Sequence, residues 1–213
     1  MMGKPLLDRR QPWSLRTLLL FGAFAFVTVP NTVQAHLVTS GVGPFFDGLA
    51  HFFLTLDDLL VVVALSLFSG LLGKSSARHC VLLLPLGWLV GMPLGLWLGG
   101  RLDGSAWATA ITLLLGGLLL GISPKIPSWG IAALACMIGL VHGSWNGAEM
   151  SATETSAIAS LGIVTATGFV TLVLSATAVS APAAWQKIAF RVLGSWVAAF
   201  GLIALAWHFR PNT

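Results

Sequence analysis

The chain has 213 residues, of which 56% are hydrophobic and 8% charged, and its mean hydropathy is +0.90. A soluble globular domain carries roughly 25% charged residues, so this composition excludes that class. The formal net charge of +4 does not indicate a nucleic-acid partner, because Lys4, Arg9, Arg10 and Arg16 all precede the first apolar run. The composition predicts an all-α, polytopic membrane protein whose main partner is the lipid bilayer, with no nucleic acid.

The first 35 residues have the three parts of a secretory signal peptide. A basic start is followed by the apolar stretch 17–29 and then by small residues that end at Ala35. Cleavage after Ala35 would separate a signal peptide, residues 1–35, from a transmembrane domain, residues 36–213, that begins with His36. An uncleaved anchor helix is the alternative, although this apolar stretch is short for the ~20 residues that a spanning helix needs.

Six apolar segments follow the signal, and each is long enough to cross a hydrocarbon core of ~30 Å. We expect helices, because a bilayer requires backbone hydrogen bonds to be satisfied within the segment. The expected spans are 45–72, 80–99, 105–121, 129–145, 156–180 and 188–209. Cys80 and Cys136 both lie in apolar runs, which predicts buried packing residues rather than a disulfide.

The charges of the loops predict the orientation in a bacterial inner membrane. Cleavage of the signal would leave the mature N-terminus in the periplasm, and six spans would return the C-terminus to the same side. The basic residues Lys74, Arg78, Lys125, Lys187 and Arg191 then lie on the cytoplasmic side, and Arg101 and Arg210 on the periplasmic side. This distribution fits the positive-inside rule. Six spans also divide into three plus three with opposite orientation, so we expect an inverted repeat.

Ionisable side chains are costly inside a membrane and are therefore candidates for a functional site. The first span contains Asp47, His51, Asp57 and Asp58. On a continuous helix, Asp47, His51, Thr55 and Asp58 would share one face, whereas Asp57 would point about 120° away from His51. Asp47 could instead be a solvated residue at a helix end, His51 an interfacial histidine, and Asp57 and Asp58 the N-terminal residues of a helix that begins later.

The second cluster lies at the end of the fourth span. His142, Asn146 and Glu149 have spacings that align them on one helix face, provided that Gly143 and Gly147 do not break the helix. The first span starts at the periplasm and the fourth ends there, so both clusters are expected in the periplasmic half of the protein. Glu149 could also be a solvated residue at the helix end.

The residue types in the two clusters indicate a metal ion. The apolar spans through residue 180 contain no Lys or Arg in their interiors, and a buried carboxylate without a basic partner must be protonated, hydrated or matched by a cation. Imidazoles with carboxylate and amide oxygens suit Ni, Co or Zn, whereas the absence of placed Cys or a Met cluster argues against Cu(I). His36, exposed by cleavage, would add an imidazole and an amine, or it would simply be a terminal residue.

The two clusters resemble those of the HupE/UreJ family, membrane proteins associated with nickel supply to hydrogenase and urease. The family's first-span pattern is a His, five residues and Asp-His, and here it reads His51, five residues, Asp57-Asp58. The family's fourth-span pattern is close to His-Gly-x-x-His-Gly-x-Glu, and here it reads His142-Gly-Ser-Trp-Asn146-Gly-Ala-Glu149. Oxygen ligands replace two imidazoles, so the sequence resembles a divergent branch with a harder site.

The resemblance implies that His51, Asp57, His142 and Glu149 handle metal. It favours Asp57, whereas helical phase favours Asp58; a kink or a non-helical turn near residues 54–58 could bring both inward.

The expected function is a permease that takes a divalent metal from the periplasm, with nickel first and cobalt next; the two oxygen ligands also raise the case for zinc or manganese. The metal is a transported substrate, so no permanently bound cofactor and no catalytic residue is expected. Partners would be a periplasmic metal-binding protein or metalloenzyme maturation factors. Two alternatives are an intramembrane zinc-dependent hydrolase and a non-transporting subunit for metalloenzyme assembly.

Overall fold

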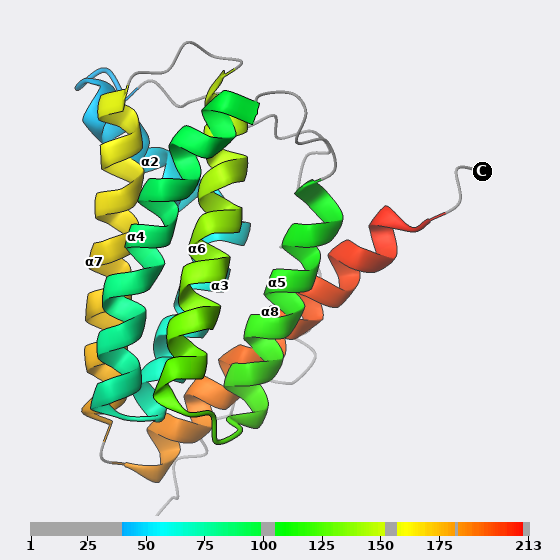
Figure 1. Cartoon of the computed structure of the whole chain (residues 1–213). Helices are drawn as coiled ribbons and strands as arrows, with labels where there is room; N and C mark the ends of the chain where they lie inside the picture. The colour runs from blue at the N-terminus through cyan, green and yellow to red at the C-terminus, as the bar shows by residue number, and fades with distance from the viewer. Residues whose placement is uncertain (1–39, 99–104, 152–156, 182, 211–213) are drawn as a thin grey trace, which may run out of the picture. The chain divides into compact units, whose positions relative to one another are not determined.

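The computed structural model describes residues 40–98, 105–151, 157–181 and 183–210. The expected signal peptide, residues 1–35, and His36 lie outside the described residues. Where the chain is described, its regular structure is entirely helical, which confirms the all-α class (Figure 1). The helices are α2 (Pro44–Leu54), α3 (Leu56–Leu71), α4 (Lys74–Leu98), α5 (Ser105–Ile122), α6 (Ser128–Ser151), α7 (Ala157–Val179) and α8 (Ala184–His208).

Four of these helices, α4, α6, α7 and α8, are long and apolar enough to cross a membrane. The pair α2 and α3 passes the same test only when the two are counted together as a fifth span, and α5 is a shorter apolar helix. The fold is therefore that of a multi-pass membrane protein. The full set of six spans stays a prediction, because α5 is close to the minimum of about 17 residues that can cross a bilayer.

The expected continuous helix over 45–72 is wrong. The helix is interrupted at Thr55, where α2 and α3 meet at a bend of 74°. The Thr55 hydroxyl and backbone N–H both donate to the carbonyl oxygen of His51, which ends α2. Asp57 and Asp58 lie in the first turn of α3, where the positive end of the helix dipole stabilises carboxylates. The alternative of a kink near residues 54–58 is what is seen, and α3 begins at Leu56, before both carboxylates.

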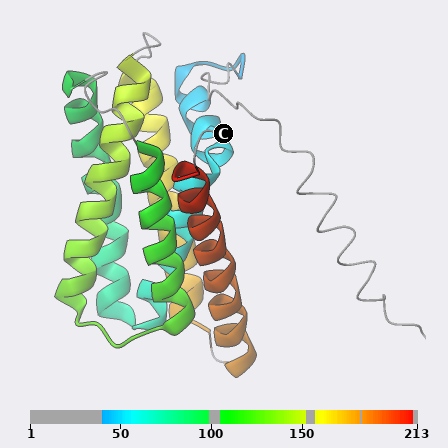
Figure 2. The same cartoon turned by 90° about the vertical axis from the view of Figure 1, so that its right-hand side faces the viewer.

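Glycines allow α4 and α6 to pack closely side by side (Figures 1 and 2). Gly87, Gly91 and Gly95 of α4 lie against the backbone of α6 around residues 136–148. Residue numbers rise together along both helices, so the two run parallel. Small residues at four-residue spacing let two helix backbones approach in this way.

Two further packings complete the bundle. Gly117 of α5 contacts Ala198 of α8, and Gly201 of α8 contacts Leu114 of α5, so these two helices are antiparallel. In Figure 2 they lie side by side along one flank of the bundle. The pair α2 and α3 runs along α7, with Gly48 against Ala159 at one end and Gly70 against Ser175 at the other.

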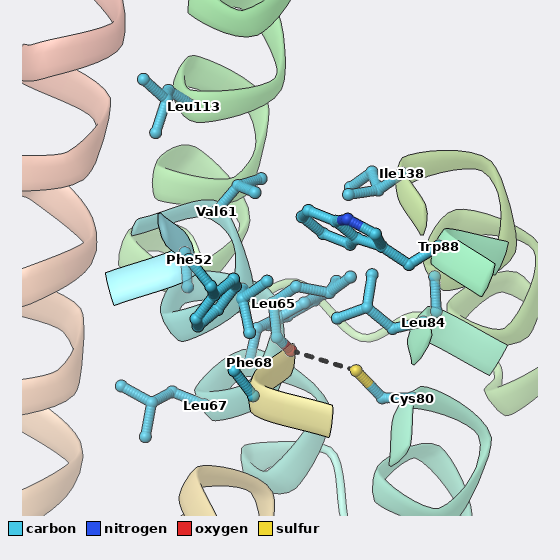
Figure 3. Close-up of a cluster of buried hydrophobic side chains, with 14 of the residues drawn as sticks. Phe52, Val61, Leu65, Leu67, Phe68, Cys80, Leu84, Trp88, Leu113 and Ile138 are labelled. Carbon is cyan, nitrogen blue, oxygen red and sulfur yellow. Dashed lines mark hydrogen bonds between the residues drawn. The ribbon is translucent and has the colours of Figure 1, made fainter. Parts of the chain in front are cut away.

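The centre of the bundle is an apolar cluster formed mainly by α3 and α4 (Figure 3). Leu65 and Phe68 from α3 face Leu84 and Trp88 from α4, and all four are completely buried. Both cysteines are free thiols; Cys80 is buried beside these residues, as predicted, whereas Cys136 is half-buried. This cluster closes the interior of the bundle beneath the polar residues described next.

Candidate functional site

The side chains of Asp58, His142 and Asn146 meet inside the bundle. The Nδ1 atom of His142 is 2.6 Å from Oδ1 of Asp58, and the side-chain amide of Asn146 donates to Oδ2 of Asp58 at 2.7 Å. Asp58 is 2% exposed and His142 1% exposed. One carboxylate therefore receives a donor on each oxygen, in an interior where an unpaired charge would be strongly disfavoured.

Two local features of the sequence bring these residues together. The helix is interrupted at Thr55, and a new helix, α3, begins at Leu56. Asp58 lies in the first turn of α3 and faces α6. Gly143 and Gly147 do not break α6, which is continuous to Ser151. Instead these glycines lie against Trp88 and Met92 of α4. His142 and Asn146 thus stay one turn apart on one buried face, and the Asn146 amide also donates to the His142 carbonyl at 3.0 Å.

A third helix supplies a partner for the other nitrogen of His142. The hydroxyl of Thr112, on α5, lies 2.9 Å from Nε2 of His142 and donates to the carbonyl of Thr109 at 2.8 Å. A hydroxyl has one hydrogen, so its oxygen must accept from Nε2 when it donates to Thr109. The contacts at Nδ1 and Nε2 together fix the orientation of the imidazole between Asp58 of α3 and Thr112 of α5.

Aromatic rings surround the imidazole of His142. The ring of Trp88, from α4, is 5.5 Å from it between centroids, and that of Trp145 is 5.2 Å away in an edge-on arrangement. Phe52, near the end of α2, packs edge-on against Trp88 at 6.2 Å. Figure 3 shows both Phe52 and Trp88 within the buried cluster. Apolar walls of this kind exclude water and strengthen electrostatic interactions inside.

Thr112 and Trp88 were missed by the sequence reasoning, which counted ionisable residues. Each is the kind of residue that is common in apolar spans, so neither gave a signal of its own. The sequence does contain a signal for the helix break at Thr55, because Thr55-Leu-Asp-Asp58 has the form of a helix capping box. Asp58 makes no such cap, and its carboxylate is directed to His142 and Asn146 instead.

Asp47 and His51 lie on α2, on the other side of the bend from Asp58. Asp47 accepts a hydrogen bond from the backbone N–H of Ser40 and so stabilises the turn before α2. His51 is buried, but on α2, which packs against α7 rather than α6. The shared face that was expected for Asp47, His51, Thr55 and Asp58 is therefore wrong, because the change of direction at Thr55 breaks the helical phase.

Asp57 and Glu149 lie at the margins of the same region. Asp57 is half-buried beside Asp58, whereas Glu149 is exposed near the end of α6. In the described part of the chain, no group of three or more His, Cys, Asp or Glu side chains is placed to hold a metal ion. The protein groups that meet are thus one carboxylate, one imidazole and one amide.

Several buried polar atoms around this centre lack a hydrogen-bond partner among the described residues. They are Oδ1 of Asn146, Nε2 of His51 and Nε1 of Trp88. Unpaired buried polar atoms are rare and each costs about 1–3 kcal/mol. A hydrated cation would suit them, since the amide oxygen can accept or coordinate and the indole can donate to a bound water.

Comparison with known proteins identifies one family. The sequence model of the family described as HupE / UreJ protein matches residues 24–204, which is most of the chain. No curated protein and no solved structure gives a significant match.

Proposed function

The chain belongs to the HupE/UreJ family, and from this premise we propose that it is an inner-membrane permease for a divalent transition metal. The family is linked to nickel and cobalt transport and to accessory roles for urease and hydrogenase, and it is not a family of catalytic enzymes. The expectation that the chain is not an enzyme is therefore confirmed. Nickel is the proposed main substrate, cobalt the next, and zinc a weaker one.

The observation that carries the proposal is the buried carboxylate of Asp58, held by His142 and Asn146. A histidine that binds metal through one nitrogen commonly donates its other N–H to a carboxylate. We infer that Nε2 of His142 takes the metal in place of Thr112, while Asp58 orients the ring and supplies negative charge. The protein ligands are too few to strip the ion of all its water, which suits a permeation site that must also release its ion.

A metal binds a neutral imidazole, so Nε2 of His142 carries no hydrogen when the ion is bound. The Thr112 hydroxyl would then give up its contact with Nε2 and keep its bond to the carbonyl of Thr109. His51, Asp57 and Glu149 are proposed as residues of the route from the periplasm, with Asp47 and His36 at its entrance.

The topology proposed for this permease has six spans after a cleaved signal, with both mature termini in the periplasm. The packing supports an inverted repeat of three plus three. The second and fourth spans, α4 and α6, pack in parallel, and the first and fifth, α2–α3 and α7, also run parallel. In such a repeat, the first three spans correspond in order to the last three. The pair α4 and α6 then corresponds to the pair α7 and α2–α3, and the pair α5 and α8 corresponds to itself.

The test is metal flux into proteoliposomes that contain a chelating dye, under an imposed membrane potential. Wild type should carry Ni and Co faster than Zn and Mn, and His142→Ala should abolish flux. His208→Ala is the control, because His208 is exposed at the end of α8. Equal loss in both variants would contradict a localised site. Absence of flux in wild type that still retains metal after purification would instead favour an accessory subunit for metalloenzyme assembly.

A further inference from the structure

A groove lies between α4 and α7, at the end of the bundle where α4 begins and α7 ends. Figure 1 shows these two helices side by side. The volume of the groove is about 410 Å³. The residues that define it are Lys74, Arg78, Leu82, Leu172, Ala176 and Ser180. None of them belongs to the centre around Asp58.

The mouth of the groove carries positive charge without a counter-charge. Lys74 and Arg78 are four residues apart, so their side chains emerge from the same face of α4. Both are exposed, and neither forms an ion pair within the described ranges. The described carboxylates lie on α2, in the first turn of α3 and near the end of α6, away from this groove. Two like charges at this spacing repel each other, so an anion bound between them would be stabilising.

The rest of the groove is apolar and faces outward. Leu82, one turn after Arg78, is 60% exposed, and Leu172 on the facing helix is 53% exposed. Both lie on helices that are apolar enough to span a membrane, so the medium that these leucines meet there is the lipid hydrocarbon. The distance from Arg78 to Leu82 along the helix is one turn, or about 5.4 Å.

The groove therefore changes from cationic to apolar over the same short distance as a phospholipid changes from phosphate to acyl chain. Basic pockets between transmembrane helices on the cytoplasmic side are known places for acidic headgroups. We propose that the groove between α4 and α7 binds one anionic phospholipid. Its phosphate lies between Lys74 and Arg78, and an acyl chain runs between Leu82 and Leu172.

Binding is measured by native mass spectrometry of the full-length, detergent-purified protein titrated with phosphatidylglycerol. Phosphatidylcholine with the same acyl chains gives the reference. Wild type should prefer phosphatidylglycerol. The variant Lys74→Gln/Arg78→Gln should lower that preference about 25-fold, because each basic residue near a headgroup contributes roughly fivefold. The matched control is Lys125→Gln/Lys187→Gln, which removes the same charge outside the groove and should keep the preference.

A second pair of variants tests the apolar half with the charges unchanged. Ala176→Trp fills the groove and should lower phosphatidylglycerol occupancy. Val173→Trp puts the same bulk on α7 at an exposed position outside the groove and should leave occupancy intact. All variants are compared as monodisperse protein by gel filtration, so that loss of binding is separated from loss of fold.

Three results would overturn the proposal. Equal wild-type binding of both lipids would show that charge is not recognised. Equal losses in the two double variants would show that only overall charge matters. Displacement of phosphatidylglycerol by inorganic phosphate at millimolar concentration would show that the site takes a free anion rather than a lipid.

Discussion

At the scale of single residues, the hydroxyl of Thr112 sets the hydrogen-bond state of His142. It is the partner of Nε2, while Asp58 is the partner of Nδ1. The imidazole is therefore fixed at both nitrogens, and its orientation toward α5 follows from both bonds. A side chain that is held so tightly in an aromatic enclosure is pre-organised for a ligand that binds at Nε2.

Replacement of Thr112 by Val should lower the free energy of unfolding by about 1–3 kcal/mol, because Nε2 of His142 would be left buried and unpaired. Thr165→Val is the control. Thr165 is exposed, and its hydroxyl bonds only to Leu161 of its own helix. Its replacement should change stability by less than about 0.5 kcal/mol. Denaturant unfolding of the two variants in micelles measures the difference, and similar costs would argue against the bond to His142.

Asn146 is the residue at which this chain departs most informatively from the family pattern. Its amide donates to Asp58, while its oxygen has no hydrogen-bond partner in the described part of the chain. The change Asn146→His restores an imidazole, which can also donate to Asp58, and exchanges a hard oxygen for a softer nitrogen. Because imidazole favours nickel over manganese, the Ni-to-Mn ratio of proteoliposome flux should rise. An unchanged or lower ratio would remove Asn146 from the ion's coordination.

At the scale of elements, close approach of α4 and α6 holds His142 in place. Gly143 follows His142 directly, and a Cβ atom there would lie 2.8 Å from the Cα of Trp88. Gly143 thus meets the backbone of the residue whose indole lies 5.5 Å from the imidazole of His142. Helix packing and site geometry are coupled through this one position.

The change Gly143→Ala should destabilise the protein by about 1–3 kcal/mol, as overpacking does, and it should also weaken metal retention. Gly168→Ala on α7 should instead stabilise the protein. Its Cβ would meet only the Pro85 ring at 3.6 Å, an ordinary contact, so the gain in helix propensity of up to about 1 kcal/mol should remain. Thermal unfolding of both variants gives the signs, and a stabilised Gly143→Ala would contradict the packing.

At the scale of the whole molecule, charge is distributed unevenly between the two ends of the bundle. Lys74, Lys125 and Lys187 lie where α4, α6 and α8 begin. The described carboxylates belong to α2, the first turn of α3 and the end of α6. This arrangement separates a basic end, which in the proposed orientation faces the cytoplasm and would interact with acidic lipids, from an acidic end that would attract divalent cations.

The orientation can be tested with single cysteines in a Cys80→Ala/Cys136→Ala background. A membrane-impermeant maleimide should label Arg210→Cys in intact spheroplasts and should label Lys125→Cys only after lysis. The antiparallel packing of α5 and α8 puts these positions at opposite ends of the bundle. Labelling of Lys125→Cys alone in intact spheroplasts would invert the proposed topology.

The sequence by itself determined the helical membrane class, the family and the two clusters from which the site is built. Hydropathy and residue spacing are local properties, and they suffice for these conclusions. It did not determine which cluster residues meet. Asp58 was favoured by helical phase, and it does face His142, but the phase argument assumed an unbroken helix.

Only the tertiary structure decided the membership of the site. The bend at Thr55 separates α2, which carries Asp47 and His51, from α3, whose first turn brings Asp58 to His142 and Asn146 of α6. Thr112 and Trp88 join His142 from α5 and α4, which are distant in sequence. The physical reason is that a helix break resets side-chain directions, and the contacts that follow depend on how the glycine faces of separate helices pack.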